Sequence, residues 1–300
     1  MKNRIVLFAL MALACACSKT DSSPREEEFG IFPALQNGRF GDPAEYPASI
    51  WIGNCSATVI GERVVQTASH CVKNGGTIRF SVLSGQYTAR CEQHSQYRGN
   101  ATADWSYCLT DRVVQGIPYE SIETDITALK VGMLITLSGY GCTKWNGPLD
   151  GRYRIGESQI IRMPNEQRSD YDIVTNGKAA VCSGDSGGPA FLMKDDGTRK
   201  VVTANSRRDT SSLESFLPFT AVSTNVAFMK NWAGRNGVEI CGVHANAKGC
   251  RNVPLAPPVL DFTIVGKTLK LVGNLLPSAK YTAEEARQEF KAVVDRLDAK

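Results

Sequence analysis

The 300-residue sequence has no run of lysines and arginines, no glycine-rich loop of the phosphate-binding type and no internal repeat. Its formal net charge of +4 at pH 7 is too small and too dispersed to indicate a nucleic-acid-binding surface. Hydrophobic residues make up 42% of the chain and aromatic residues 8%, which suits a folded, water-soluble core. We therefore expect a globular protein with no nucleic-acid partner.

Histidine is scarce, with only His70, His94 and His244 in the chain. No Cys-x-x-Cys pair and no histidine-rich ligand set is present, so the sequence predicts no zinc site. We expect neither a metal nor a cofactor. His94 and His244 stand in no recognisable motif, and we expect both at the surface.

The N-terminal apolar run, IVLFALMALACAC, is too short to span a bilayer. It follows the basic stretch MKNR and precedes the polar stretch SKTDSSPREEE, an order that is typical of an export signal. A core helix is the alternative, but nothing downstream offers this stretch a packing pattern. We expect residues 1–17 to be a signal peptide and residues 18–34 to be a spacer and propeptide. The protein would then be secreted, periplasmic or lipid-anchored at the cell envelope.

Two cysteines, Cys15 and Cys17, lie at the end of the apolar run and resemble the lipidation box of bacterial lipoproteins. A large aliphatic residue is usual three places before the modified cysteine, and Ala12 and Ala14 stand there instead. A lipid anchor to a membrane and simple cleavage nearby both stay open. After export, the remaining eight cysteines indicate disulfides, which four pairs can form in many ways.

Many short β-like runs separated by turns fill the chain from about Leu35 to Thr224, which indicates an all-β sandwich or pair of barrels rather than βαβ units. One helix is predicted over NVAFMKNWAGRNG, residues 225–237. VPLAPP is expected to be a stiff linker. In the last segment, Thr282 and Glu285 form a capping box ahead of an amphipathic helix.

The segment VCSGDSGGPA, residues 181–190, sets Ser186 among glycines, which are used where the backbone bends sharply or approaches another group closely. Such a serine can be a plain surface turn or a nucleophile. A nucleophilic serine needs a base to take its proton and a third group to orient that base. His70 follows the β-like run RVVQTA, and Asp104 precedes an apolar, strand-like segment.

These segments resemble the chymotrypsin/trypsin-like serine protease family. Its histidine motif, TAAHC, reads TASHC here, and its serine motif, GDSGGP, is complete from Gly184 to Pro189. Its aspartate motif, usually DIAL, reads DWSY from Asp104. SGYGCT is similar to the family's SGWG, and LQNGRFGDPAEYP, residues 35–47, is similar to its mature N-terminus. The resemblance covers roughly residues 35–238.

The order of the three residues is an independent check, because GDSGG also satisfies the Gly-x-Ser-x-Gly motif of α/β-hydrolases. That family places its acid and its histidine after the serine. Only His244 follows Ser186, and it lies between the neighbouring cysteines Cys241 and Cys250. The order His70, Asp104, Ser186 favours the protease family.

The resemblance implies an all-β fold of two packed six-stranded antiparallel β-barrels, with a C-terminal helix and a short C-terminal extension. Residues 35–240 would form the protease domain, and residues 241–300 an extension with a disulfide loop and an amphipathic helix. It also implies a monomer that acts on protein or peptide substrates. Cys55 and Cys71 match the family's disulfide beside the histidine, and proximity in that fold implies the pairs Cys91–Cys108 and Cys142–Cys182. Cys241 and Cys250 are expected to close a local loop.

The resemblance also assigns catalytic roles. Ser186 would attack the scissile carbonyl, His70 would take its proton, and Asp104 would orient His70. The backbone N–H groups of Gly184 and Ser186 would form the oxyanion hole. The alternatives are a half-buried core histidine at position 70 and a turn-capping aspartate at position 104. A catalytically silent, protease-like binding or adhesion domain is the rival function, although no residue of the triad is missing.

The specificity pocket of this family is set by the residue six places before the nucleophile, here Ala180. Ala180 cannot pair with Lys or Arg, so we expect the protease to cut after small or apolar residues. Ser206 matches the serine behind the triad, at the wall of the pocket, but Arg207 and Arg208 replace the tryptophan and glycine that usually follow. Because these two residues are cations, a preference for substrates with Glu or Asp before the scissile bond stays open as the alternative.

Activation in this family buries a new N-terminal amine against the aspartate before the serine, here Asp185. The alignment puts that amine on Leu35, so the cut would fall after Ala34. Because a pocket with Ala180 at its base can accept alanine, we hypothesise that the protein cuts its own propeptide. Cleavage by another protease, or no cleavage, are the alternatives.

Overall fold

The computed structural model describes residues 35–142, 144, 147–209 and 211–251, and the backbone of β15 (Phe262–Val265) and β16 (Thr268–Leu271). Strands β15 and β16 pair with each other as a two-stranded antiparallel sheet. The expected signal peptide, spacer, lipidation cysteines, VPLAPP linker and last amphipathic helix lie outside the described residues.

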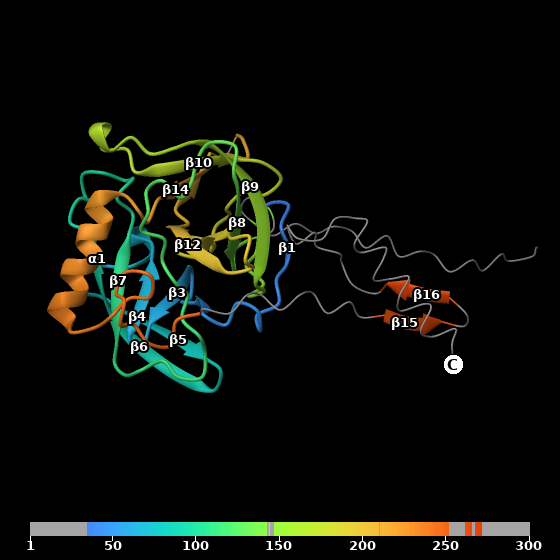
Figure 1. The fold of residues 1–300 in the computed structure, drawn as a ribbon, viewed down its shortest axis with the longest axis horizontal. Coiled ribbons are helices and arrows are strands. Elements are labelled where there is room, and N and C mark those ends of the chain that lie inside the picture. The colour runs from blue at the N-terminus through green and yellow to red at the C-terminus, as the bar shows by residue number, and fades with distance from the viewer. Residues whose placement is uncertain are drawn as a thin grey trace, which may run out of the picture. The chain divides into compact units, whose positions relative to one another are not determined.

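The first large sheet has six antiparallel strands, in the order β2-β3-β4-β7-β6-β5 (Figure 1). Along β5 the residues alternate between exposed and buried, which gives a strand with one face in water and one in the core. The edge strands β2 and β5 approach each other, so the sheet curls into a barrel. Its strands are β2 (Ser49–Trp51), β3 (Ser56–Gly61), β4 (Val64–Thr67), β5 (Thr77–Val82), β6 (Gly85–Gln93) and β7 (Ser106–Thr110).

The second sheet has eight strands, in the order β12-β11-β8-β9-β10-β14-β13, with β1 paired to β9. The expected all-β fold is confirmed, and two strands of two residues each, β1 and β13, add to the six expected. A bridge between Thr203 and Phe219 brings the end of β12 to the residue after β14. The strands are β1 (Arg39–Phe40), β8 (Leu134–Gly139), β9 (Arg154–Arg162), β10 (Asp172–Asn176), β11 (Pro189–Met193), β12 (Arg199–Ala204), β13 (Arg207–Arg208) and β14 (Ser215–Pro218).

Three helical segments accompany the sheets: the short 3-10 turns η1 (Ser69–Cys71) and η2 (Glu166–Arg168), and the helix α1 (Ser223–Asn236). Helix α1 lies beside β7 (Figure 1), where the ring of Trp232 packs on Tyr107 and the Tyr107 hydroxyl donates to Asn225. The helix ends at Gly237, whose φ of 61° is the left-handed conformation that glycine adopts most easily. No helix in the described part of the chain is long and apolar enough to cross a membrane.

The segment between the two sheets is fixed by a fully buried ion pair between Glu120 and Arg199 of β12. The Arg199 guanidinium also lies over the rings of Tyr46 and Phe191 and donates to the carbonyl of Glu45. The Nε and Nη2 atoms of this guanidinium are hydrogen-bonded to the protein, which replaces part of its lost hydration, while Nη1 is buried without a hydrogen-bond partner among the described residues. The linking segment is thereby anchored to the second sheet.

Four disulfides cross-link the described residues, and they are the same four pairs that are expected from the sequence. One joins neighbouring strands β6 and β7, and another closes a loop of nine residues after α1. The pairs are Cys55–Cys71, Cys91–Cys108, Cys142–Cys182 and Cys241–Cys250.

Candidate active site

The first sheet brings His70 and Asp104 together at one of its ends. His70 lies on η1, directly after β4, and Asp104 lies just before β7; β4 and β7 are paired, with Thr67 opposite Ser106. The His70 Nδ1 atom is 2.7 Å from Asp104 Oδ2, and the His70 backbone N–H donates to Asp104 Oδ1 over 2.9 Å. With its proton on Nδ1, the imidazole presents the lone pair of Nε2.

The Asp104 carboxylate is buried, and a third donor holds it. The hydroxyl of Ser206 donates to Asp104 Oδ2 over 2.6 Å. Buried polar groups need such hydrogen-bond partners to replace the water that burial removes. The His70 side chain is 36% exposed, so the face of the imidazole away from Asp104 is open to an incoming molecule.

Ser186 comes from the second sheet, in the turn that leads into β11. Its Oγ donates to the carbonyl of Ser206 over 3.3 Å, and its carbonyl accepts the N–H of Ser56 over 2.8 Å. Ser206 therefore contacts both Ser186 and Asp104, one through its carbonyl and the other through its hydroxyl. Sequence comparison placed Ser206 at the wall of the specificity pocket, and the structure puts its hydroxyl on Asp104.

The turn before Ser186 can be built only with glycine at position 184. Gly184 has φ of +95°, which L side chains rarely adopt. A Cβ on this residue would lie 2.8 Å from Leu149 Cδ2 and 3.0 Å from Gly141 Cα. The close approach of these two backbone segments explains the glycine that the sequence singled out.

Asp185 is fully buried beneath the same turn. Its carboxylate accepts the N–H of Gly141 and the N–H of Cys182, each over 2.8 Å. Burial raises the pKa of Asp185 to about 7, because two neutral donors offset only part of the lost hydration. Leu35 is fully buried as well.

The expected base of the specificity pocket, Ala180, is buried and forms a β-bridge with Gln36, whose carbonyl accepts the Ala180 N–H over 3.1 Å. The next residue, Val181, donates its N–H to Ser215 Oγ over 3.0 Å. The pocket segment is therefore held between the start of the described chain and β14.

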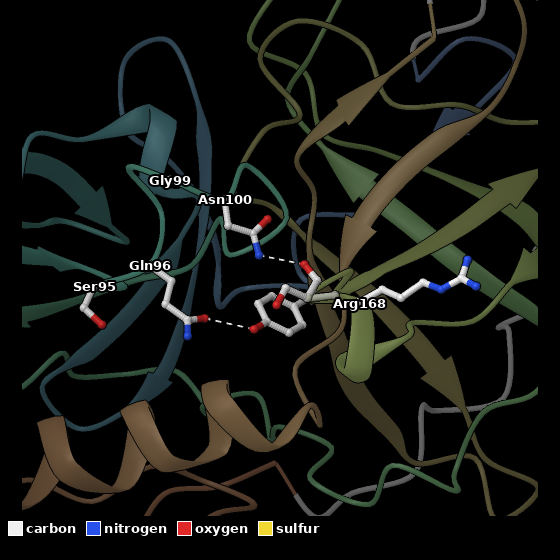
Figure 2. Close-up of a pocket in the computed structure, with 7 residues that line it drawn as sticks. Ser95, Gln96, Gly99, Asn100 and Arg168 are labelled. Carbon is white, nitrogen blue, oxygen red and sulfur yellow. Dashed lines mark hydrogen bonds between the residues drawn. The ribbon is translucent and has the colours of Figure 1, made fainter.

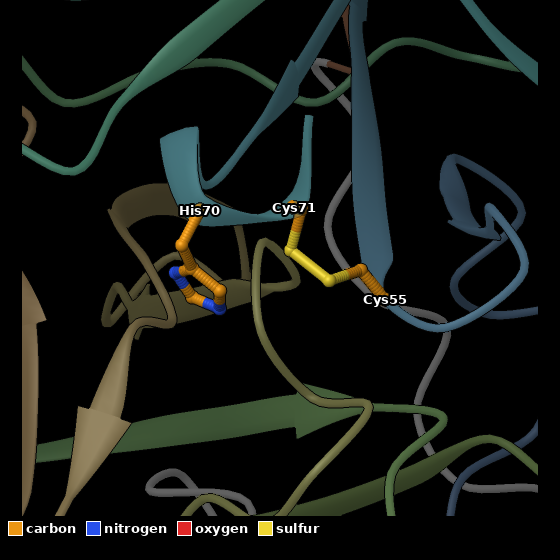
Figure 3. A group of neighbouring side chains, drawn as sticks. All are labelled: Cys55, His70 and Cys71. Carbon is orange, nitrogen blue, oxygen red and sulfur yellow. A yellow bond between two sulfur atoms is a disulfide. The ribbon is translucent and has the colours of Figure 1, made fainter. Parts of the chain in front are cut away.

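Figure 3 shows Cys55, His70 and Cys71 close together, within reach of one another as metal ligands would be. The two sulfur atoms are bonded to each other. A disulfide sulfur has no thiolate to offer a metal. The group is a cross-link beside the histidine and not a metal site.

His94 is buried, and the expectation that it lies at the surface is wrong. Its ring packs edge-on against Trp105 and Phe228, and its Nδ1 accepts the N–H of Gln96 over 3.3 Å. These aromatic partners, distant in the sequence, bury it, and burial lowers the pKa of His94. His244 is half-buried, and its Nδ1 accepts the N–H of Ile240.

A hollow of about 640 Å³ lies between residues 95–100 and residues 168–171, which the sequence did not indicate (Figure 2). Two hydrogen bonds join its sides: Asn100 Nδ2 donates to the Ser169 carbonyl, and the Tyr171 hydroxyl donates to Gln96 Oε1. Residues 95–100 belong to the loop that leads to Asp104, but none of the residues that line the hollow is one of the candidate catalytic residues.

The site combines a buried aspartate hydrogen-bonded to a histidine with a serine in a glycine-rich turn of the second sheet. This arrangement is typical of hydrolases that use a serine nucleophile. The model of the Trypsin family matches residues 37–233, and the chain belongs to this family.

The chain is also similar to individual known proteins, at the low identities of 23% to 27%. The chain is 27% identical to Serine protease SP24D of Anopheles gambiae, over 53% of this chain and 67% of that protein. It is 23% identical to Chymotrypsin-C of Mus musculus, over 75% of this chain and 96% of that protein. It is 26% identical to Trypsin eta of Drosophila erecta, over 62% of this chain and 79% of that protein.

Proposed function

We propose that the protein is a serine endopeptidase whose nucleophile is Ser186, whose general base is His70 and whose orienting acid is Asp104. The observation that carries the proposal is the 2.7 Å contact between His70 Nδ1 and Asp104 Oδ2. It fixes the tautomer in which Nε2 can take a proton. In the part of the chain that the structure describes, Ser186 Oγ donates to the Ser206 carbonyl and has no hydrogen bond to His70, so the proposed reaction requires this hydroxyl to turn toward His70 Nε2.

The reaction follows from these roles. Ser186 Oγ bonds to the scissile carbonyl carbon while its proton passes to His70 Nε2. His70 then gives that proton to the leaving amine, which leaves an acyl-enzyme, and water repeats the steps to release the acid. Within the described residues, no hydrogen bond uses the N–H of Gly184 or of Ser186. These two donors suit the oxyanion that forms on the carbonyl oxygen.

A test combines labelling with hydrolysis. A fluorophosphonate should label the protein, and the protein should hydrolyse an unstructured protein substrate. Ser186→Ala should abolish labelling and lower hydrolysis by about 10⁶-fold, by analogy with triad knockouts. The matched control is Ser183→Ala, an exposed serine in the same turn, which should keep both. Labelling that persists in Ser186→Ala would show that Ser186 is not the nucleophile, whereas an inert wild type would favour the rival function of a silent binding domain.

We also propose that a free amine on Leu35 pairs with Asp185 after removal of the preceding residues. The burial of both residues and the raised pKa of Asp185 support this pairing, since a buried carboxylate gains most from a cation. Which protease makes the cut after Ala34, this one or another, stays a prediction. Export by residues 1–17, with or without a lipid on Cys15 or Cys17, is proposed on the sequence alone.

A further inference from the structure

The turn that carries the two proposed oxyanion donors, residues 183–186, is held through its carbonyl groups. In a planar trans peptide the N–H points away from the carbonyl of the preceding residue, so a bond to that carbonyl also fixes where the N–H points. Among the residues that the structure describes, each of the four carbonyls has one donor. In order along the turn, these donors are the Cys142 N–H, the Ser56 hydroxyl, the Gly188 N–H and the Ser56 N–H, at 2.7 to 3.0 Å.

One of those four donors belongs to a side chain, and it bonds to the carbonyl of Gly184. Gly184 has no Cβ and a φ of +95°, so its own backbone does little to hold the peptide plane that follows it. That plane lies between the plane with the Gly184 N–H and the plane with the Ser186 N–H. The Ser56 hydroxyl, which donates to the Gly184 carbonyl over 2.7 Å, therefore holds the angle between the two oxyanion donors.

The orientation of the Ser56 hydroxyl is fixed by its second partner. Its Oγ accepts the N–H of Tyr140 over 3.0 Å, so its own proton is left for the Gly184 carbonyl. Ser56 is 1% exposed, and water does not compete for these bonds. A buried hydroxyl that donates and accepts at once links the loop at Tyr140 to the turn at Gly184.

Ser56 also joins the turn to the strand that leads to His70. Its carbonyl accepts the hydroxyl of Thr67, the last residue of β4, over 2.9 Å. Figure 3 shows the neighbouring disulfide, which ties Cys55, next to Ser56, to the residue after His70. Ser56 thus lies where the segments of the proposed nucleophile and the proposed base meet. Its bonds go to backbone groups of the turn, and none in the described part of the chain goes to a side chain of the proposed triad.

We propose that Ser56 is a positioning residue, which holds the N–H groups of Gly184 and Ser186 in the directions that stabilise the oxyanion. The inference rests on the proposed endopeptidase function. Oxyanion donors lower the barrier because they already point to where the negative charge develops. An interaction that matters mainly in the transition state changes kcat more than substrate binding. Loss of the Ser56 hydroxyl should therefore lower kcat and leave KM nearly unchanged.

The test measures kcat and KM of the full-length protein on a peptide amide, with active sites counted by complete fluorophosphonate labelling. In Ser56→Ala, kcat per labelled site should fall by about 10-fold, the effect of losing one hydrogen bond, with KM within about twofold of wild type. A peptide aldehyde, whose adduct with Ser186 places an oxygen at the oxyanion position, should bind more weakly by a similar factor. Ser56→Gly also lacks the hydroxyl and should repeat both changes.

The matched control is Ser49→Ala. Ser49 is a buried serine of the neighbouring strand β2, and its hydroxyl is hydrogen-bonded to Tyr153 rather than to the turn. This variant should shift the denaturant midpoint as Ser56→Ala does and keep kcat per labelled site. The pH at which kcat/KM is half-maximal should be the same in Ser56→Ala and wild type, because the groups that transfer the proton are untouched.

Counting labelled sites removes the contribution of misfolded chains from kcat. Wild-type kcat per labelled site in either Ser56 variant overturns the proposal and leaves the endopeptidase function standing. An equal fall in Ser49→Ala also overturns it, since the effect would then come from a general loosening of the sheet, and so does a rise of KM with kcat unchanged. If the wild type hydrolyses no peptide and takes no fluorophosphonate, both proposals are wrong.

Discussion

The candidate site has two halves, which we call the relay half (His70, Asp104 and Ser206) and the pocket half (Ala180, Ser215 and Arg208). In the relay half, three donors converge on one buried carboxylate. In the pocket half, the small residue Ala180 is bridged to Gln36, and the Arg208 guanidinium donates to the side-chain oxygen of Gln36. The first arrangement prepares a proton transfer that every substrate needs. The second lies in the segment where the resemblance expects the substrate side chain, so the halves should respond differently to mutation.

The two neighbouring arginines show the same difference within one strand. Arg207 is paired with Asp172, whereas Arg208 shares a face with the pocket segment. Their side chains are identical, and the alternation of the strand places them on opposite faces.

The strongest test of the division is Asp104→Asn, which affects the relay half alone. An amide cannot accept both the His70 backbone N–H and its ring N–H in the same way, so the imidazole loses its required tautomer. We expect kcat to fall by about 10⁴-fold for every peptide, by analogy with the same substitution in the catalytic triad of another serine protease. The ratio of kcat/KM between peptides that differ before the scissile bond should not change. Asp111→Asn, on an exposed aspartate just after β7, is the control, and an altered ratio in Asp104→Asn would contradict the division.

A second carboxylate, Asp185, gives a pH-dependent test. Burial raises its pKa to about 7 in the folded chain, above the usual value of an unfolded aspartate. The folded state therefore holds more protons between about pH 4 and pH 7, and the free energy of unfolding falls as pH rises through that range, by a few kcal/mol in order of magnitude. The stabilisation is complete below about pH 4.

Denaturant titrations of the full-length chain across this range measure the slope, and Asp185→Asn should remove most of it. A chain that begins at Leu35 should also lose it, because the new amine lowers the pKa of Asp185 by favouring its charged form. Equal slopes in wild type and Asp185→Asn would show that another group causes the pH dependence.

How much of this site the sequence could predict depends on the length of the motif that carries each residue. His70 and the nucleophile Ser186 could be predicted because TASHC and GDSGGP are contiguous motifs, and the pairing of β4 with β7 then accounts for the contact of His70 with Asp104. For the pocket half, the sequence singled out Ala180 as the base and left a preference for Glu or Asp open because of Arg207 and Arg208. It could not show which arginine lies on which face, because that depends on the register of β13, a strand of only two residues.

The same limit explains the remaining differences in the fold. No local pattern shows that His94 packs between Trp105 and Phe228, since these residues come from distant segments. The hollow beside residues 95–100 arises only when η2 folds against that loop. By contrast, the strands with alternating burial, such as β5, were visible from their period of two.

Removing one disulfide at a time shows how each half of the site affects the free energy of unfolding and the activity. Cys55–Cys71 closes a separation of 16 residues beside His70, and Cys142–Cys182 closes one of 40 residues beside Ala180. Double serine variants should lose about 3 and about 4 kcal/mol of unfolding free energy, from the chain-entropy model. The first should lower activity on all peptides, and the second should mainly change the relative activity on peptides that differ before the scissile bond. Calorimetry and kcat/KM on such peptides measure both, and a reversed assignment would argue against the division.

The finest test places a carboxylate in the pocket half itself. Ala180→Asp puts an acidic side chain beside the bridge to Gln36. Because a buried carboxylate needs a cationic partner, we expect this variant to favour Lys or Arg before the scissile bond, where the small base Ala180 predicts small or apolar residues for the wild type. Peptides that differ only in that residue, Ala, Gln, Glu or Lys, measure the change through kcat/KM. If the wild type already prefers Lys, then Ala180 does not form the base of the pocket.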